Sequence, residues 1–140
     1  MLIDVHAHQF PQNYIDTIAR HGRQPLGLGA GQTMEERLQL MDEAKVDVQV
    51  LSPANLVPYL EGEAEAIQAA KILNDGYADL THRWPQRFKA YVSLPLPHVD
   101  ASLREMARGL DQLGFAGVTL GCSILDLQSL AKSLNRFTRK

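Results

Sequence analysis

Two histidines separated by one residue, His6 and His8, lie in a short β-branched and apolar stretch at residues 2–8. Because side chains of a strand alternate between its faces, both imidazoles are expected on the same side. Two neutral imidazoles at this spacing can share one divalent metal, at about 2.0–2.1 Å for zinc. Asp4 precedes the pair by two residues and is expected to point the same way, either as a partner of a metal ligand or as a buried hydrogen-bonding group. The spacing alone leaves open that the two histidines only hydrogen-bond locally.

Strands and helices are expected to alternate along the rest of the chain. Thr33 and Glu36 have the spacing of a capping box at a helix start, and Gly114 lies where a left-handed helix end is expected. Asp100 or Ser102 is expected to cap the helix that ends before Gly114. The strands are predicted at residues 2–8, 46–51, 88–94 and 115–120, and the helices at 11–21, from 33, at 62–84, from 100 or 102 to 113, and at 126–137.

A strand followed by a helix, repeated four times, predicts a parallel sheet with helical crossovers. The expected strand starts at residues 2, 46, 88 and 116 have a mean spacing of 38 residues. Eight such units need about 300 residues, which is the usual size of a (β/α)8 TIM barrel. The fold class is therefore predicted as α/β, a partial (β/α)8 barrel of about four units that forms one domain over residues 1–140. Such barrels build their active sites at the carboxyl ends of the strands, where the His pair lies.

Composition restricts the class of protein further. Of the 140 residues, 45% are hydrophobic and 21% are charged, which is typical of one folded domain. The net charge of −2 argues against a nucleic-acid partner, and no apolar run is long enough for a membrane span. A single cysteine and a start without the pattern of a secretory signal predict a cytoplasmic protein.

Several ordered motifs between residues 1 and about 120 resemble the amidohydrolase-related family that includes aminocarboxymuconate-semialdehyde decarboxylase and related metal-dependent hydrolases. The segments that carry this resemblance are residues 3–8 with Phe10-Pro11, Met41-Asp42-Glu43-Ala44, Val46-Asp47, Leu51-Ser52, Asn74-Asp75, Pro85-Gln86-Arg87-Phe88, Leu94-Pro95-Leu96-Pro97 and residues 114–118.

The resemblance implies that His6 and His8 bind a catalytic divalent metal, usually zinc. It also implies an enzyme that acts on a small carboxylated metabolite. That enzyme would be either a hydrolase or a decarboxylase, the latter being a carbon–carbon lyase. The complete family site has further histidines after the fifth strand and near the sixth, and an aspartate after the eighth. This sequence has no counterpart of these three groups, and no catalytic acid or base is assigned. A chain truncated relative to the family is therefore expected.

Two alternatives follow from the missing ligands. Besides the metal-dependent enzyme, the chain could be a non-catalytic remnant, or a half-barrel that completes its site with a partner chain. His98 and Cys122 follow the third and fourth strands and are candidate further ligands, although His98 also fits an exposed loop residue and Cys122 a small half-buried filler. Open edges at the first and fourth strands, with the interior positions Val48, Val50 and Val92 left bare, predict a homo-oligomer.

Overall fold

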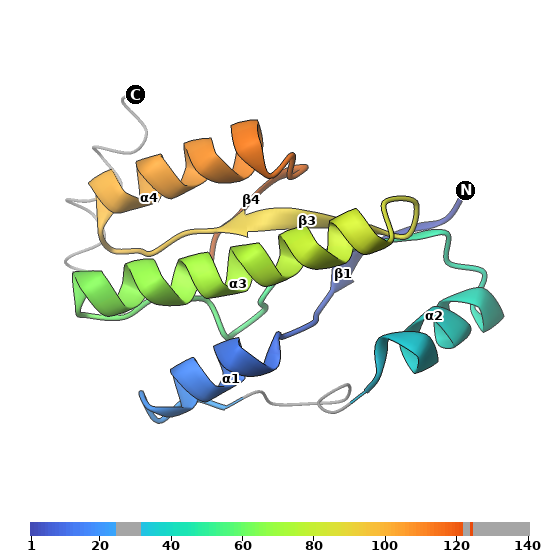
Figure 1. Cartoon of the computed structure of the whole chain (residues 1–140), viewed down its shortest axis with the longest axis horizontal. Helices are drawn as coiled ribbons and strands as arrows, with labels where there is room; N and C mark the ends of the chain where they lie inside the picture. Colours follow the sequence, from blue (N-terminus) through green and yellow to red (C-terminus); the bar gives the residue numbers. More distant parts are fainter. Residues whose placement is uncertain (25–31, 122–123, 125–140) are drawn as a thin grey trace.

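Four parallel strands form the sheet of the computed structural model, which describes residues 1–24, 32–121 and 124 (Figure 1). The strand order is β1-β2-β3-β4, as expected for successive β/α units. Within the described residues, each predicted strand is confirmed, although all are shorter than predicted. The strands are β1 (Ile3–Ala7), β2 (Val48–Leu51), β3 (Phe88–Ser93) and β4 (Gly117–Thr119).

Helices connect the strands on the way from each carboxyl end to the next strand. In the described part of the chain, two helices lie between β1 and β2, one long helix between β2 and β3, and one between β3 and β4 whose last turn is a π-helix, η1. The helices are α1 (Gln12–Ala19), α2 (Met34–Glu43), α3 (Glu63–Arg83), α4 (Val99–Ala107) and η1 (Arg108–Gln112). The predicted partial barrel of parallel strands is therefore confirmed, and the helix predicted at residues 126–137 lies outside the described residues.

Two of the predicted helix ends are confirmed and one is wrong. Thr33 and Glu36 form the capping box of α2, with Oγ1 of Thr33 accepting from the Glu36 N–H at 3.2 Å and Glu36 Oε2 accepting from the Thr33 N–H at 2.9 Å. Gly114 follows η1 with a φ of +68°, which glycine adopts without strain. However, α4 begins at Val99 rather than after Asp100 or Ser102, because the His98 carbonyl already accepts the Ser102 N–H.

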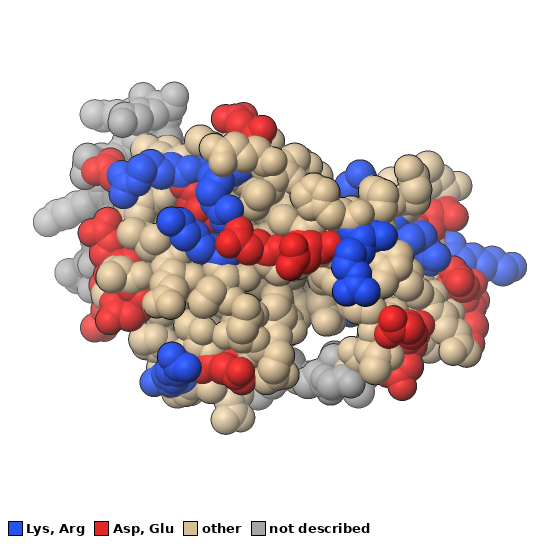
Figure 2. All heavy atoms as spheres, in the orientation of Figure 1, with Lys and Arg blue, Asp and Glu red and all other residues tan. Residues whose placement is uncertain are grey.

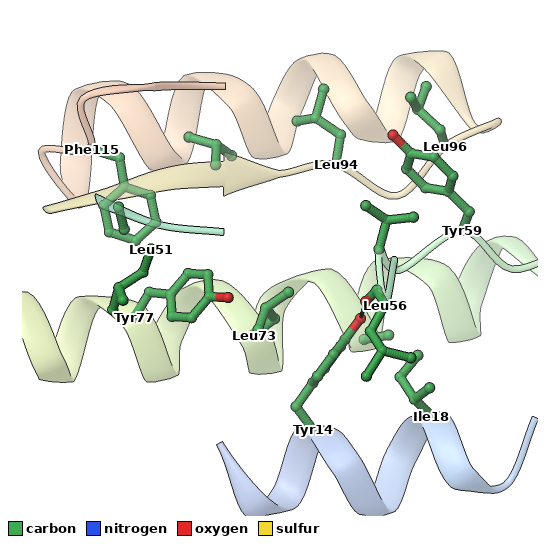
Figure 3. Close-up of a cluster of buried hydrophobic side chains, with 14 of the residues drawn as sticks. Tyr14, Ile18, Leu51, Leu56, Tyr59, Leu73, Tyr77, Leu94, Leu96 and Phe115 are labelled. Atoms are coloured by element: carbon green, nitrogen blue, oxygen red, sulfur yellow. Dashed lines mark hydrogen bonds between the residues drawn. The ribbon is translucent and has the colours of Figure 1, made fainter. Parts of the chain in front are cut away.

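The core lies between α3 and the strands, and α1 extends it at one end (Figure 3). Leu73 and Tyr77 of α3 are fully buried and point toward the sheet, where Leu51 is also fully buried. At the end of the core where α1 packs, Tyr14 donates a hydrogen bond from its hydroxyl to the Leu56 carbonyl. This packing anchors the loop that follows β2 at the carboxyl end of the sheet.

The interior positions expected to be bare are mostly covered. Val92 and Val50 are 0% and 6% exposed, and Val48 is half-buried. Val92 is covered because η1 packs on it: a Cβ added at Gly109 would lie 2.3 Å from the Val92 Cγ2 atom. Large exposed apolar side chains lie instead on or beside the edge strands, including Ile3 (48%), Val5 (61%) and Leu120 (51%). The prediction of open edges is confirmed for the described residues, but the exposed apolar residues are not the ones that were predicted.

Charged side chains of both signs are interspersed on the face of the molecule in Figure 2. That face carries no continuous stripe of lysine and arginine, in line with the small net charge of −2. Within the described part of the chain, no helix is both long enough and apolar enough to cross a membrane.

Candidate metal centre

The two histidines meet at the carboxyl end of β1. His6 lies near the end of the strand and His8 one residue beyond it, and their Nε2 atoms are 3.1 Å apart. The rings are 4.6 Å apart between centroids with an interplanar angle of 77°. Two imidazole nitrogens bound to one tetrahedral zinc ion at about 2.0–2.1 Å lie about 3.3 Å apart. The two side chains are therefore on the same side, as predicted, and their separation suits both one shared ion and the local hydrogen bond between the rings.

The second ring nitrogen of His8 fixes its tautomer. His8 Nδ1 lies 3.0 Å from the Ser52 carbonyl oxygen, at the carboxyl end of β2. Because a carbonyl oxygen only accepts hydrogen bonds, Nδ1 must carry the proton and donate it. Nε2 of the neutral ring then accepts from the His6 Nε2–H in this structure, and the same lone pair is the one with which a histidine binds a metal.

A register shift in β1 overturns the expectation for Asp4. Asp4 pairs with Gln49 and Ala7 pairs with Leu51, so three steps along β1 match two steps along β2. Asp4 and Ala7 therefore share one face, and His6, next to Ala7, lies on the other. The Asp4 side chain does not point the same way as the His pair, because the irregularity reverses the alternation. Its Oδ1 instead accepts from the backbone N–H of His6 at 3.0 Å, as a half-buried hydrogen-bonding group.

Arg37 of α2 is the residue at this site that the sequence reasoning missed. It is only 9% exposed, and it donates from Nε to Gln49 Oε1 at 2.8 Å and from Nη1 to the His8 carbonyl at 2.9 Å. Burial lowers the pKa of Arg37, and the nearby Asp4 carboxylate offsets part of that effect. A signal was present, since Arg37 lies three residues after Met34 and four before Met41, on the apolar face of α2.

These residues surround an open groove of about 450 Å³ between α2 and the first two strands. Its polar wall comes from β1 and β2 and includes the His pair, and its apolar wall comes from α2. The lining includes Asp4, His6, His8, Arg37, Leu40 and Gln49. The groove is large enough for a small metabolite next to the His pair.

No third ligand joins the pair within the described residues, where no three His, Cys, Asp or Glu side chains converge on a point. His98 occupies the N-cap position of α4 and lies half-buried, with its side-chain Nε2 3.0 Å from the Leu60 carbonyl. It is neither grouped with the pair nor the exposed loop residue of the alternative interpretation. Cys122 lies outside the described residues.

Comparisons with known proteins agree with this arrangement. The family described as amidohydrolase matches residues 3–136. Gamma-resorcylate decarboxylase of Rhizobium radiobacter is 37% identical over 84 residues, which are 59% of this chain and 26% of that enzyme. The 2-amino-3-carboxymuconate-6-semialdehyde decarboxylase of Dictyostelium discoideum is 32% identical over 89 residues, 63% of this chain and 25% of that enzyme.

The fold agrees as well. The crystal structure of 5-carboxyvanillate decarboxylase from Novosphingobium aromaticivorans, which has bound manganese, superposes with a TM-score of 0.77 at 22% identity. That superposition covers 99% of this chain and 48% of the crystallised one. The chain thus spans about half of the solved structure, and its match covers about a quarter of the relatives' sequences. Since the family match takes in nearly the whole sequence, the chain belongs to the amidohydrolase family.

Proposed function

We propose that this chain carries the first part of the metal site of a decarboxylase or hydrolase that acts on a small carboxylated metabolite, with His6 and His8 as metal ligands. The observation that carries the proposal is the approach of the two Nε2 atoms to 3.1 Å. The Ser52 carbonyl supports it, because it leaves the Nε2 lone pair of His8 available.

The residues present fit a divalent metal, and zinc is the expected ion because imidazole donors suit it. Manganese is the alternative, since it is bound in the related 5-carboxyvanillate decarboxylase. When bound, the ion would act as a Lewis acid that polarises a substrate carboxylate or activates water. His6 and His8 would hold it at the rim of the groove, and Asp4 and Ser52 would hold the two histidines.

The substrate class is inferred from two observations. The relatives are named for small carboxylated compounds, gamma-resorcylate and 2-amino-3-carboxymuconate-6-semialdehyde. In this chain, the groove beside the His pair is lined by the positive charge of Arg37, for which no carboxylate of the described residues lies within ion-pair distance. The Asp4 carboxylate offsets this charge only in part, and a positive charge without an ion-pair partner favours an anionic ligand in the groove.

A second candidate is a half-barrel that binds metal or substrate only when a second copy completes the site. A catalytic zinc typically has three protein ligands, and the described residues bring two together. The exposed Ile3 and Val5 on the edge strand β1 and Leu120 beside β4 favour this candidate. A two-fold rotation keeps all strands parallel and places β4 of one copy beside β1 of the other, giving eight strands.

Sedimentation velocity tests the second candidate. Assembly predicts a species of twice the 15.6 kDa of one chain, and Val5→Glu should convert it to a monomer. Leu110→Glu, on η1 and 38% exposed, is the matched control that should leave assembly intact. A compact monomer at micromolar concentration would rule out the homo-oligomer.

The cytoplasmic location and the absence of a nucleic-acid partner stay predictions from the sequence, as does a role for Cys122.

Elemental mass spectrometry of the purified protein, loaded with Zn²⁺ or Mn²⁺ and then desalted, tests the metal ligands. Retained metal should be lost in His6→Ala and in His8→Ala. His82→Ala is the control, because His82 lies on α3 and its Nδ1 is 2.8 Å from the Ala78 carbonyl, away from the pair. Carbon dioxide release from gamma-resorcylate and 5-carboxyvanillate then tests the activity. Metal at background level in the unmodified protein would favour the non-catalytic remnant.

A further inference from the structure

We propose that Arg37 is a positioning residue that fixes the backbone of both His6 and His8, and so sets the geometry of the pair. Its link to a metal ion rests on the proposed function, whereas the effect on the pair's geometry does not. Two routes of hydrogen bonds lead from the guanidinium, one to each histidine, and together they are called the Arg37 network: Asp4, Arg37, Gln49 and the backbone groups of His6 and His8.

The route to His8 is direct. Arg37 Nη1 donates to the His8 carbonyl at 2.9 Å, and at 3.4 Å it also lies within reach of Gln9 Oε1. Because the guanidinium is planar and rigid, the direction of this N–H is fixed once Nε is bound elsewhere. Nε is bound to Gln49 at 2.8 Å. The position of the His8 carbonyl is therefore set relative to the side chain of Gln49 on β2.

The route to His6 passes through two side chains. Gln49 Nε2 donates to Asp4 Oδ2 at 3.0 Å, and Asp4 Oδ1 accepts the backbone N–H of His6 at 3.0 Å. Arginine can only donate and an ionised carboxylate can only accept, so the Gln49 amide fits between them in one orientation. Each of the three side chains can take only this place in the order of donors and acceptors. Replacing any of them with a side chain of different hydrogen-bonding type should therefore break the connection from Arg37 to the His6 backbone.

The strand itself gives His6 less support than a regular strand would. The pairing of β1 with β2 is shifted between Asp4 and Ala7, which is the stretch that holds His6. β1 is also an edge strand of the described sheet, with β2 as its only partner there. Side-chain hydrogen bonds to the backbone are thus a main determinant of where His6 lies relative to His8.

The burial of Arg37 points to the same role. Burying a cation is costly, and that cost is normally offset by a carboxylate partner. Arg37 is 9% exposed, and its hydrogen bonds go to the neutral acceptors of Gln49, His8 and Gln9. Such an arrangement contributes little net stability, so its effect is expected on local geometry more than on the free energy of unfolding.

The test compares Arg37→Lys with Arg87→Lys in the full chain. Arg87 is a matched control, because it also binds backbone near β2, at the Asp47 carbonyl (3.0 Å), but at the amino end of that strand. Zn²⁺ affinity of the folded protein is measured by competition with a chelator. The exchange rate of the His6 backbone amide is measured by NMR without metal. Arg37→Lys should weaken Zn²⁺ binding about 10-fold or more and speed exchange of the His6 amide, while Arg87→Lys should change neither.

Gln49→Glu provides a second variant in case Arg37→Lys does not fold. The glutamate keeps an acceptor for Arg37 but has no N–H for Asp4, so it should loosen the His6 amide and leave the His8 contact in place. The proposal is overturned if either folded variant leaves the His6 amide as protected as Arg87→Lys does. If the unmodified protein binds no Zn²⁺, the proposed function fails, and the amide exchange alone still decides the positioning role.

Discussion

Two arginines, Arg37 and Arg108, each hold together elements that are distant in the sequence, but they differ in how their charge is balanced. Arg108 forms ion pairs with Glu105 and Asp75, with N–O distances of 2.7 Å to each, and these hydrogen bonds raise its pKa. Arg37 binds neutral acceptors, and burial lowers its pKa. The difference indicates that Arg108 holds its helices through ion pairs, whereas Arg37 holds neutral groups next to the His pair.

The Arg108 network, defined as Asn74, Asp75, Glu105, Arg108 and the backbone of Ser93, fastens α3 and α4 to the end of β3. Asn74 is fully buried, and its Nδ2 donates to the Ser93 carbonyl at 2.9 Å and to Glu105 Oε1 at 2.7 Å. Its Oδ1 accepts the Ser93 N–H at 2.9 Å. We therefore expect changes in this network to lower stability and to leave the metal affinity of the folded protein unchanged, the reverse of the Arg37 network.

The largest effect is expected for Asn74→Ala. The change leaves the buried N–H and carbonyl of Ser93 without this partner and should lower the free energy of unfolding by about 3 kcal/mol. Urea denaturation measures the loss, and chelator competition on the folded fraction should give an unchanged Zn²⁺ affinity. If affinity falls as far as in Arg37→Lys, the two networks do not have separate tasks.

A smaller loss is expected for Gly109→Ala, next to Arg108 on η1. The new Cβ would lie 2.3 Å from the Val92 side chain, and such overpacking should cost about 2 kcal/mol. The double variant Gly109→Ala/Val92→Ala is the matched control, because it removes the clash, and it should regain part of the stability lost in the single variant. Thermal unfolding checks both. An unchanged melting temperature in Gly109→Ala would mean that η1 is not packed tightly on β3.

Glu105→Gln should cost about 1.5 kcal/mol, because Arg108 loses one of its two carboxylate partners but keeps Asp75. A glutamine oxygen can still accept from Asn74, so the loss should stay below that of Asn74→Ala. Urea denaturation of both variants in parallel gives the ranking. A larger loss for Glu105→Gln would show that the charge of Glu105, and not the hydrogen bonds of Asn74, holds α4 in place.

The framework of the fold could be predicted from the sequence, and the supports of the site could not. Local patterns predicted the positions of the strands, the capping box at Thr33 and the turn at Gly114, because each depends on neighbouring residues. The register shift in β1 has no compositional signal, so the direction of Asp4 was predicted wrongly. The contacts of Arg37 join residues 29 and 12 positions apart, and only the folded chain brings these groups together.

The smallest loss of stability is expected for Arg87→Lys. This variant shows how much an arginine outside the Arg37 and Arg108 networks contributes. Arg87 pairs with Asp42 at 2.8 Å, but the Asp42 side chain is 68% exposed, so solvent screens the pair. Because lysine keeps the charge and loses the fork of N–H groups, the loss of stability should be about 0.5 kcal/mol. Urea denaturation at low and high salt measures it. A loss as large as that of Glu105→Gln would mean that the hydrogen bonds of Arg87 to the Asp47 and Val46 carbonyls stabilise the fold at the amino end of β2. The comparison of arginines that have carboxylate partners with those that do not would then have to count backbone acceptors as well.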